Sequence, residues 1–264
     1  MKVLIIPDVH LKSWIFHQAD TLVPKNKYDR IVCLGDICDD WNQDFNLDLY
    51  KATFEYLLDF DKNHPDTLWC YGNHDISYLY HFIESGFSDM LCESIKKLVL
   101  QMQTELKDRL AVMHRIDNVL FSHAGLTADY VEKHFKNDDD IDSIINKVNG
   151  FIKTKKQANN IWQPDSPIWE RPQHNYSRYP IEMYKADKYW QIIGHSPTEK
   201  PEESVICSTN DIKRNKHGII QLQNFLSLDT FSTTSQGDPI GDQRLVIIDT
   251  KKHKWEYAHP ALKI

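Results

Sequence analysis

Five short polar blocks, each rich in aspartate, asparagine or histidine, follow apolar runs along the first three quarters of the chain. They are Asp8-Val9-His10, Gly35-Asp36, Gly72-Asn73-His74-Asp75, Ser122-His123-Ala124-Gly125 and Gly194-His195. Carboxylate and imidazole together suit manganese, iron, zinc or similar divalent ions, whereas calcium and magnesium prefer all-oxygen shells. Two such ions about 3.5–4 Å apart, bridged by a shared carboxylate, can activate water and polarise a phosphoryl group. The blocks therefore predict a two-metal hydrolytic site.

Taken singly, these blocks have ordinary explanations. Asp-x-His pairs are common, turns favour the types found at Gly72-Asn73, and Gly194-His195 alone would be a turn with a hydrogen-bonded histidine. Their shared position at the ends of apolar runs favours the metal site, because the carboxyl ends of parallel strands meet at one edge of a sheet. Glycine beside a polar residue also lets the backbone approach a metal or phosphate closely.

The apolar runs predict the strands that position these blocks. Short runs bounded by Asp, Pro, Gly or Asn read as buried strands at Val3–Ile6, Ile31–Leu34, Thr67–Tyr71, Val119–Ser122 and Tyr189–Ile193. Leu47–Asp61 has apolar residues at helical spacing between the second and third runs. This alternation of strand and helix predicts parallel strands in βαβ units.

Other segments complete the predicted architecture. Residues 77–109 are expected to be mostly helical, with an interruption near Ser85-Gly86. Asp117-Asn118 is expected to form the turn of a hairpin between 110–116 and 119–122. Another helix is expected to begin at Thr127. Further strands are expected in the last quarter, at residues 205–207, 218–222, 225–228, 245–249 and 255–258. We predict an α/β fold, a two-sheet sandwich flanked by helices, in one domain spanning 1–264 with an irregular, aromatic-rich lid or groove segment around 160–190.

Composition limits the function classes. The 264 residues are 41% hydrophobic and 26% charged, as in a soluble globular protein, and no apolar run approaches the ~20 residues of a membrane helix. The apolar run Val3–Ile6 is too short for a signal-peptide core, so we expect a cytoplasmic location. A net charge of −7 argues against stable binding of nucleic acid. Five cysteines without a CxxC pair argue against a disulfide framework or a zinc ribbon.

The order D-x-H, GD, GNH, H-A-G and GH resembles the calcineurin-like metallophosphoesterase family over residues 8–195. Leu228-Asp229-Thr230 and residues 245–249 also look like the C-terminal strands of that family. Gly35-Asp36-x-x-Asp39 leans toward the branch of the Ser/Thr protein phosphatases and diadenosine tetraphosphatases. The combined motifs are specific for the superfamily and much less specific for a substrate.

The resemblance implies a role for each matching residue. Two divalent ions, manganese first and iron, zinc, nickel or cobalt as alternatives, would be held by Asp8, His10, Asp36, Asn73, His123 and His195. Asp36 would bridge the two ions, and a metal-bridging hydroxide would attack phosphorus. His74 would be the general acid oriented by Asp39, a role that also suits an imidazole whose pKa is raised beside a carboxylate.

The departures from the family pattern bear on the substrate. Leu11 replaces a glycine, and Asp40 stands where the protein phosphatases have a phosphate-clamping arginine. Arg171 resembles a second family arginine and is a candidate for that role, with a solvated loop residue as the alternative. Pro197, two residues after His195, cannot ligate a metal as the histidine of many phosphodiesterase branches does.

These observations predict a dinuclear metal-dependent phosphatase for phosphate monoesters. The alternatives are a phosphodiesterase or dinucleoside polyphosphate hydrolase, and a non-catalytic binding scaffold with the same fold. The expected substrate is a phosphorylated small molecule, a nucleotide or a phosphoprotein, and no membrane partner is expected.

Overall fold

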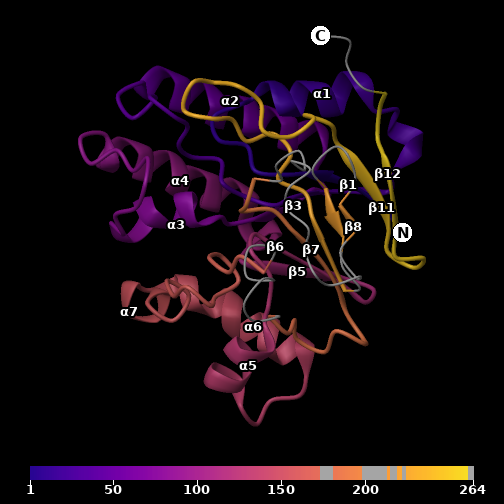
Figure 1. Cartoon of the computed structure of the whole chain (residues 1–264). Coiled ribbons are helices and arrows are strands. Elements are labelled where there is room, and N and C mark those ends of the chain that lie inside the picture. Colours follow the sequence, from indigo (N-terminus) through magenta and orange to yellow (C-terminus); the bar gives the residue numbers. More distant parts are fainter. Residues whose placement is uncertain (173–180, 198–212, 215–218, 222–223, 261–264) are drawn as a thin grey trace.

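Two six-stranded sheets pack face to face in the computed structural model, which describes residues 1–172, 181–197, 213–214, 219–221 and 224–260 (Figure 1). The first sheet has, in spatial order, β12 (Lys254–Tyr257), β11 (Val246–Asp249), β1 (Lys2–Ile6), β2 (Arg30–Cys33), β3 (Leu68–Cys70) and β4 (Leu110–Ala111). The second has β5 (Met113–Ile116), β6 (Val119–Ser122), β7 (Trp190–Ile193), β10 (Phe225–Ser227), β9 (Ile220–Gln221) and β8 (Lys213–Arg214).

Helices cover the outer faces of both sheets, with α1 and α2 at the top of Figure 1 and α5 and α6 at the bottom. The helices are α1 (Trp14–Leu22), α2 (Leu47–Asn63), α3 (Asn73–Tyr80), α4 (Cys92–Leu106), α5 (Ala128–Phe135), α6 (Ile141–Gly150) and α7 (Lys155–Ala158). Short 3₁₀ turns lie at Lys25–Lys27, Lys107–Arg109 and Phe151–Lys153. The predicted α/β sandwich flanked by helices is confirmed.

The apolar runs form strands because both of their faces are buried. In β1, Val3 and Ile5 belong to the hydrophobic cluster between the sheets, while Leu4 and Ile6 belong to the cluster under the helices. A strand covered on both faces needs a continuous apolar run rather than an alternating one. β1, β2, β3 and β4 run parallel, as do β6, β7 and β10, so several strand ends meet at one edge of the sandwich.

The structure divides two segments that the sequence presented as continuous. The run 110–116 contributes β4 to the first sheet and β5 to the second, with Val112 between them, and the predicted hairpin turn follows at Asp117 and Asn118. Residues 81–91 interrupt the expected helix 77–109 more widely than predicted. His81 ends α3 with a φ of 54° and Gly86 has a φ of 80°, both incompatible with a continuing helix.

Three predictions fall wholly or partly outside the described residues. The strand predicted at 205–207 falls wholly outside, and so do residues 218 and 222 of the strand predicted at 218–222 and residues 173–180 of the aromatic-rich segment. In the described part of that segment Trp162 stacks on Phe82 with ring centroids 4.7 Å apart, so this side chain serves packing. The interpretation of 1–264 as one domain stays a prediction.

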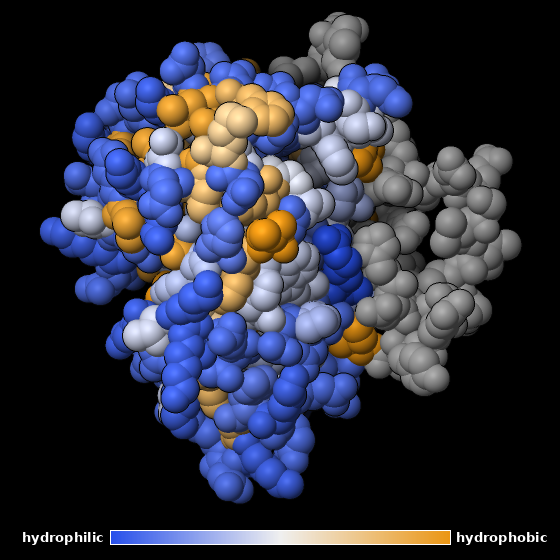
Figure 2. Space-filling model, turned by 90° about the vertical axis from the view of Figure 1, so that its left-hand side faces the viewer, coloured by the Kyte–Doolittle hydropathy of each residue, from blue (hydrophilic) through white to orange (hydrophobic). Residues whose placement is uncertain are grey.

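The surface in Figure 2 is mostly hydrophilic, with hydrophobic residues in patches separated by hydrophilic ones. Among the described helices, none combines the length and apolar character needed to cross a membrane.

Candidate metal centre

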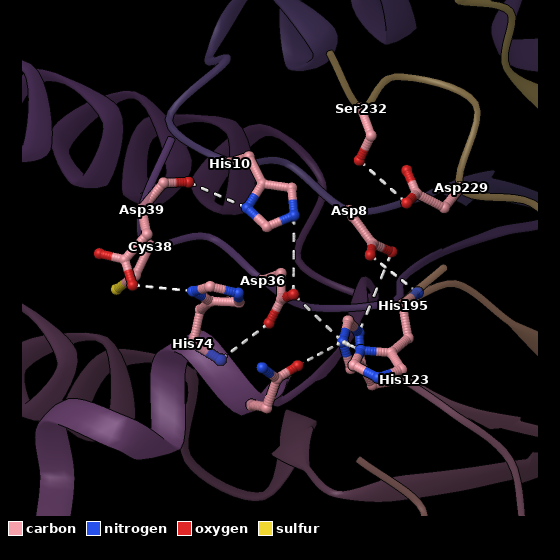
Figure 3. Close-up of polar contacts among 12 residues, drawn as sticks. Asp8, His10, Asp36, Cys38, Asp39, His74, His123, His195, Asp229 and Ser232 are labelled. Carbon is pink, nitrogen blue, oxygen red and sulfur yellow. Dashed lines mark hydrogen bonds and ion pairs between the residues drawn. The ribbon is translucent and has the colours of Figure 1, made fainter. Parts of the chain in front are cut away.

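The predicted site residues converge from both sheets onto one cluster (Figure 3). Asp8 and His10 follow β1, Asp36 follows β2, and Asn73 begins α3 just after β3, while His123 and His195 follow β6 and β7 of the other sheet. Among the described residues, two groups of three side chains each bring one possible ligand atom per residue within 4.8 Å of the others, and both groups contain Asp36. The groups are His10, Asp36 and His74, and Asp36, His123 and His195. The structure therefore places Asp36 at the centre of the cluster.

The backbone at these strand ends adopts conformations that few side chains tolerate. His10, Asp36, Asp39 and His195 have φ values of 45°, 48°, 63° and 65°, in the left-handed region. Such strain persists only where surrounding contacts enforce it, and it is concentrated at functional sites. Here His10 N donates to Asp36 O at 2.7 Å, so the two loops brace each other.

Two glycines leave the space that the carboxylates of Asp36 and Asp8 occupy. A Cβ placed on Gly72 would lie 1.8 Å from Oδ1 of Asp36, and one on Gly194 would lie 1.9 Å from Oδ1 of Asp8. Neither glycine has a positive φ, so their role is to leave room for the carboxylates. This is the physical reason for glycine in those two blocks.

Asp75, to which the sequence analysis gave no role, joins the second and third blocks. Its Oδ1 accepts from the backbone N–H groups of Ile37 and Cys38 at 2.9 and 3.1 Å, and its Oδ2 accepts from Gly72 N at 3.0 Å. Burial and the nearby Asp36 carboxylate raise the pKa of Asp75 to about 6. The signal for this role was the acidic residue three positions after Gly72, at the start of α3.

Each candidate imidazole ligand has one nitrogen engaged by a backbone carbonyl. His123 Nδ1 donates to Leu34 O at 3.0 Å, and His10 Nδ1 donates to Asp39 O at 2.9 Å. The other nitrogen, Nε2, then faces Asp36 Oδ2, at 3.1 Å from His123 and 3.7 Å from His10. This is how proteins orient histidine for metal binding.

His195 repeats the arrangement with the nitrogens exchanged. Its Nε2 donates to Trp169 O at 3.1 Å, and its Nδ1 lies 3.0 Å from Nε2 of His123. Asn73 Oδ1 also lies 3.0 Å from Nε2 of His123. Three ligand-type atoms therefore surround one point beside Asp36: His123 Nε2, His195 Nδ1 and Asn73 Oδ1.

The carboxylate of Asp8 fits a cation. Oδ2 accepts from His195 N at 2.8 Å, while the buried Oδ1 accepts no hydrogen bond from the described residues. Burial and the carboxylate of Asp229 raise the pKa of Asp8 well above its usual value. A buried acceptor without a donor costs free energy, and a bound cation would remove that cost.

The charge balance around Asp36 also suits cations. Burial opposes ionisation of this carboxylate, but His123, His74 and His10 more than offset burial and lower its pKa. Burial lowers the pKa of His123, whereas Asp36 and Asp8 raise it, with a net result of about 9. The cluster thus requires compensating positive charge, which protons or metal ions can supply.

His74 lies beside this cluster and is held by a buried network. Its Nδ1 donates to Asp39 Oδ2 at 2.8 Å, and its backbone N–H donates to Asp36 Oδ1 at 3.0 Å. The other Asp39 oxygen accepts from the hydroxyls of Tyr50 and Tyr78 at 2.5 and 2.6 Å. Burial lowers the pKa of His74, but Asp36, Glu84 and Asp39 together raise it well above its usual value.

Glu84, in the segment between α3 and α4, was missed by the sequence analysis. Its Oε2 accepts a short hydrogen bond from Nδ2 of Asn73 and lies 3.8 Å from Nε2 of His74. Its other oxygen is buried and accepts no hydrogen bond from the described residues. Glu84 therefore orients the Asn73 amide, with Oδ1 toward His123. No local pattern marked this residue, because it lies in an irregular segment.

Asp229 adds a sixth strand end to the site. It follows β10, which runs parallel to β7, and its buried carboxylate accepts from Ser232 Oγ at 2.9 Å. Burial raises its pKa to about 6. The apolar run Phe225–Leu228 followed by an aspartate was the available signal.

The sequence profile of the calcineurin-like phosphoesterases matches residues 1–240. The chain belongs to the calcineurin-like phosphoesterase family. No curated protein sequence matches the chain significantly.

Solved structures of similar fold include a cold-active protein-tyrosine phosphatase of the psychrophile Shewanella sp., at 14% identity and a TM-score of 0.59 over 98% of this chain and 80% of that one. A second structure of a cold-active protein tyrosine phosphatase has 13% identity and a TM-score of 0.54, covering 97% of this chain and 78% of that one. A metallophosphoesterase from Sphaerobacter thermophilus has 15% identity and a TM-score of 0.44, covering 97% and 86%.

Members of the calcineurin-like phosphoesterase family act on phosphoesters, and this chain has a cavity of about 420 Å³ at the predicted centre. Arg171 lines it and donates through Nη1 to Ser196 Oγ at 2.8 Å and His195 O at 3.2 Å. Asp40 also lines it, and its carboxylate pairs with Nζ of the largely buried Lys12 at 2.9 Å. Lys12 therefore offsets the negative charge that Asp40 introduces.

Proposed function

We propose that this calcineurin-like phosphoesterase is a metal-dependent phosphatase that hydrolyses phosphate monoesters. The observation that carries the proposal is the position of Asp36, shared by two groups of ligand-type atoms and in contact with the backbone of His74. A shared carboxylate beside a histidine that can donate a proton supplies what phosphoester hydrolysis needs. Asp8, His10 and Asp36 would hold one divalent ion, and Asp36, Asn73, His123 and His195 the other.

The ions would be manganese in the first instance, with iron, zinc, nickel or cobalt as alternatives, since the donors are oxygen and imidazole nitrogen. When bound they would polarise the phosphoryl group and supply a water molecule of lowered pKa. Asp8 supports the proposal that the site binds metal ions, because its buried Oδ1 accepts no hydrogen bond from the described residues.

His74 is assigned to proton transfer although it also reaches the ligand-type group of His10 and Asp36. Its Nδ1 is bound to the Asp39 carboxylate, which favours the protonated ring and leaves Nε2 to donate to the leaving oxygen. Asp39, fixed by two tyrosine hydroxyls, keeps the ring in that orientation. Arg171 would bind phosphoryl oxygens, since its guanidinium is tethered at the cavity wall.

Two observations favour monoesters over diesters. Pro197 lines the cavity two residues after His195 and offers no ligand there. Arg171 lines the same cavity, and its cation favours the doubly charged monoester over the singly charged diester. A protein-tyrosine phosphatase shares the fold, so the fold accommodates such a reaction, although 14% identity carries no information on the substrate of this chain.

The test is hydrolysis of an aryl phosphate monoester and the matching bis-aryl diester by metal-stripped protein, with and without manganese. We expect manganese-dependent turnover that prefers the monoester and falls at least about 100-fold in Asp36→Asn, because the variant loses the shared anionic ligand. Preference for the diester would reject the monoesterase assignment. Metal binding without turnover of either ester, or of a nucleotide panel, would indicate a binding scaffold.

A further inference from the structure

Trp41 lies on the wall of the cavity that holds the candidate metal centre. The same cavity is lined by His10, Asp36, His74 and Arg171. Trp41 is 54% exposed, although large aromatic side chains are usually buried in the core. Any ester bound at the centre must therefore share the cavity with an uncovered indole ring.

The ring is held in place by a contact with a distant segment. The indole N–H donates to Thr233 O at 2.8 Å. The backbone at this position is fixed locally, because Trp41 N donates to Oδ1 of Asp40 at 2.9 Å. The next residue repeats the connection, since Nδ2 of Asn42 donates to Ser235 O at 3.0 Å. Because its polar group is already bonded, the indole offers only its apolar surface, and little side-chain freedom remains to be lost on binding.

Trp41 also belongs to the loop that carries the partner of the proposed proton donor. It follows Asp39, the partner of His74, by two residues, and His74 is the proposed proton donor to the leaving oxygen. Gly86 also lines the cavity, and a Cβ there would be 3.5 Å from Asp39 Cβ and 3.9 Å from His74 Cε1. Phe87 comes next and also lines the cavity, with one face stacked on Tyr78 at 4.6 Å.

We propose that Trp41 is a stacking platform for a planar aromatic ring in the leaving group of the substrate. The inference rests on the proposed phosphatase function and deepens it to a substrate class. A flat, fixed ring favours a flat partner, because stacking adds attraction beyond the burial of apolar area alone. The aromatic ring could be a phenol bonded directly to the ester oxygen or a nucleobase attached through its sugar, and the experiment below separates these sources.

The decisive comparison uses benzyl phosphate and cyclohexylmethyl phosphate. Both have an alkyl ester oxygen and similar size, and they differ in whether the ring is flat and aromatic. We expect Trp41→Leu to lower kcat/KM for benzyl phosphate about three- to tenfold and that for cyclohexylmethyl phosphate by less than about twofold. Trp41→Phe, which keeps an aromatic ring, should recover most of the loss.

Phe45→Ala is the matched control. Phe45 belongs to the same loop and is 68% exposed, but it does not line the cavity. Its replacement should leave the ratio of the two esters unchanged. Equal losses on both esters in Trp41→Leu, or the same selective loss in Phe45→Ala, would overturn the platform.

A nucleotide pair identifies the source of the ring. Phenyl phosphate carries its ring directly on the ester oxygen. Adenosine 5′-monophosphate carries a base on its sugar, and ribose 5-phosphate is the matching ester without the base. A Trp41→Leu loss on phenyl and benzyl phosphates that spares adenosine 5′-monophosphate supports a ring close to the ester oxygen, as in a phenol. A loss on adenosine 5′-monophosphate that is larger than the loss on benzyl phosphate, with ribose 5-phosphate unaffected, supports a nucleobase. Unchanged kcat/KM for every aromatic ester rejects the inference.

A binding measurement keeps this inference separable from the proposed function. Benzylphosphonate and cyclohexylmethylphosphonate cannot be hydrolysed, so calorimetry on manganese-loaded protein reports the ring contact without turnover. Absence of monoester hydrolysis would reject the phosphatase function. A preference for benzylphosphonate that disappears in Trp41→Leu would still support the platform, and equal affinities in the wild type would reject it.

Discussion

Nδ1 of His74 donates a hydrogen bond to Oδ2 of Asp39 at 2.8 Å, and this carboxylate is itself fixed by the hydroxyls of Tyr50 and Tyr78. The imidazole is therefore oriented by a buried network before any substrate binds. We expect His74→Asn to lower kcat about 10²- to 10⁴-fold for esters of poor leaving alcohols, since general acid catalysis contributes on that scale.

The loss of kcat in His74→Asn should be much smaller for a nitrophenyl ester, whose leaving oxygen needs no proton. Asp39→Asn should show the same dependence on the leaving group, with smaller losses of kcat. The measurement is the dependence of kcat on leaving-group pKa, with metal content determined for each variant. A loss of equal size across all leaving groups would indicate that His74 acts in some other way.

Glu84 is expected to matter through the Asn73 amide. Glu84→Ala removes the acceptor for Asn73 Nδ2, and we expect manganese affinity at the second site to fall about 10- to 100-fold, the usual effect of losing a group that orients a ligand. Glu84→Gln keeps an oxygen acceptor and should retain most of the affinity. Calorimetric titration of stripped protein gives both constants. Wild-type affinity in the alanine variant would show that Asn73 does not need this contact.

A methyl group at position 194 should displace Asp8 without removing any polar group. The added Cβ in Gly194→Ala would lie 1.9 Å from Oδ1 of Asp8, and we expect loss of one bound ion with the fold retained. Gly150→Ala is the control, because nothing lies within 4 Å of its added Cβ and it ends α6. That variant should keep both ions and gain up to about 0.5 kcal/mol. Metal analysis and thermal unfolding check both expectations.

His114 is expected to make stability depend on pH. Burial lowers its pKa below the usual 6.5, and its Nε2 donates to Trp69 O at 2.9 Å. Well above pH 6.5 the ring is neutral in both states, so it adds no pH dependence there. As the pH falls below that value the unfolded chain takes up a proton that the folded chain resists, and the free energy of unfolding decreases.

His114→Gln keeps a donor for Trp69 O and cannot titrate. With metal-stripped protein, urea unfolding at pH 7.5 and pH 5.5 should show a smaller loss of stability for the variant than for the wild type. The other histidines titrate in both proteins, so the difference between the two losses reports His114. Identical losses would mean that His114 titrates normally in the folded state.

The sequence by itself determined several of the strands and the residues that end them. β1, β2 and β3 were evident from apolar runs, because a strand buried on both faces has no other composition. The polar residues after those runs, such as Asp8 and Asp36, had to share an edge because parallel strands end on the same side. The family followed from the same order of blocks and is confirmed, while the branch and the ligand roles stay predictions.

Only the tertiary structure decided which residues support the site from irregular segments. Glu84 reaches Asn73 from the segment between α3 and α4, and Trp41 is anchored on Thr233, 192 positions away. Val112 likewise marks a change of sheet inside one apolar run. Local periodicity encodes which face of an element is buried, but it does not encode the path of a loop. That path is set by packing and hydrogen bonds between residues that are far apart in the sequence.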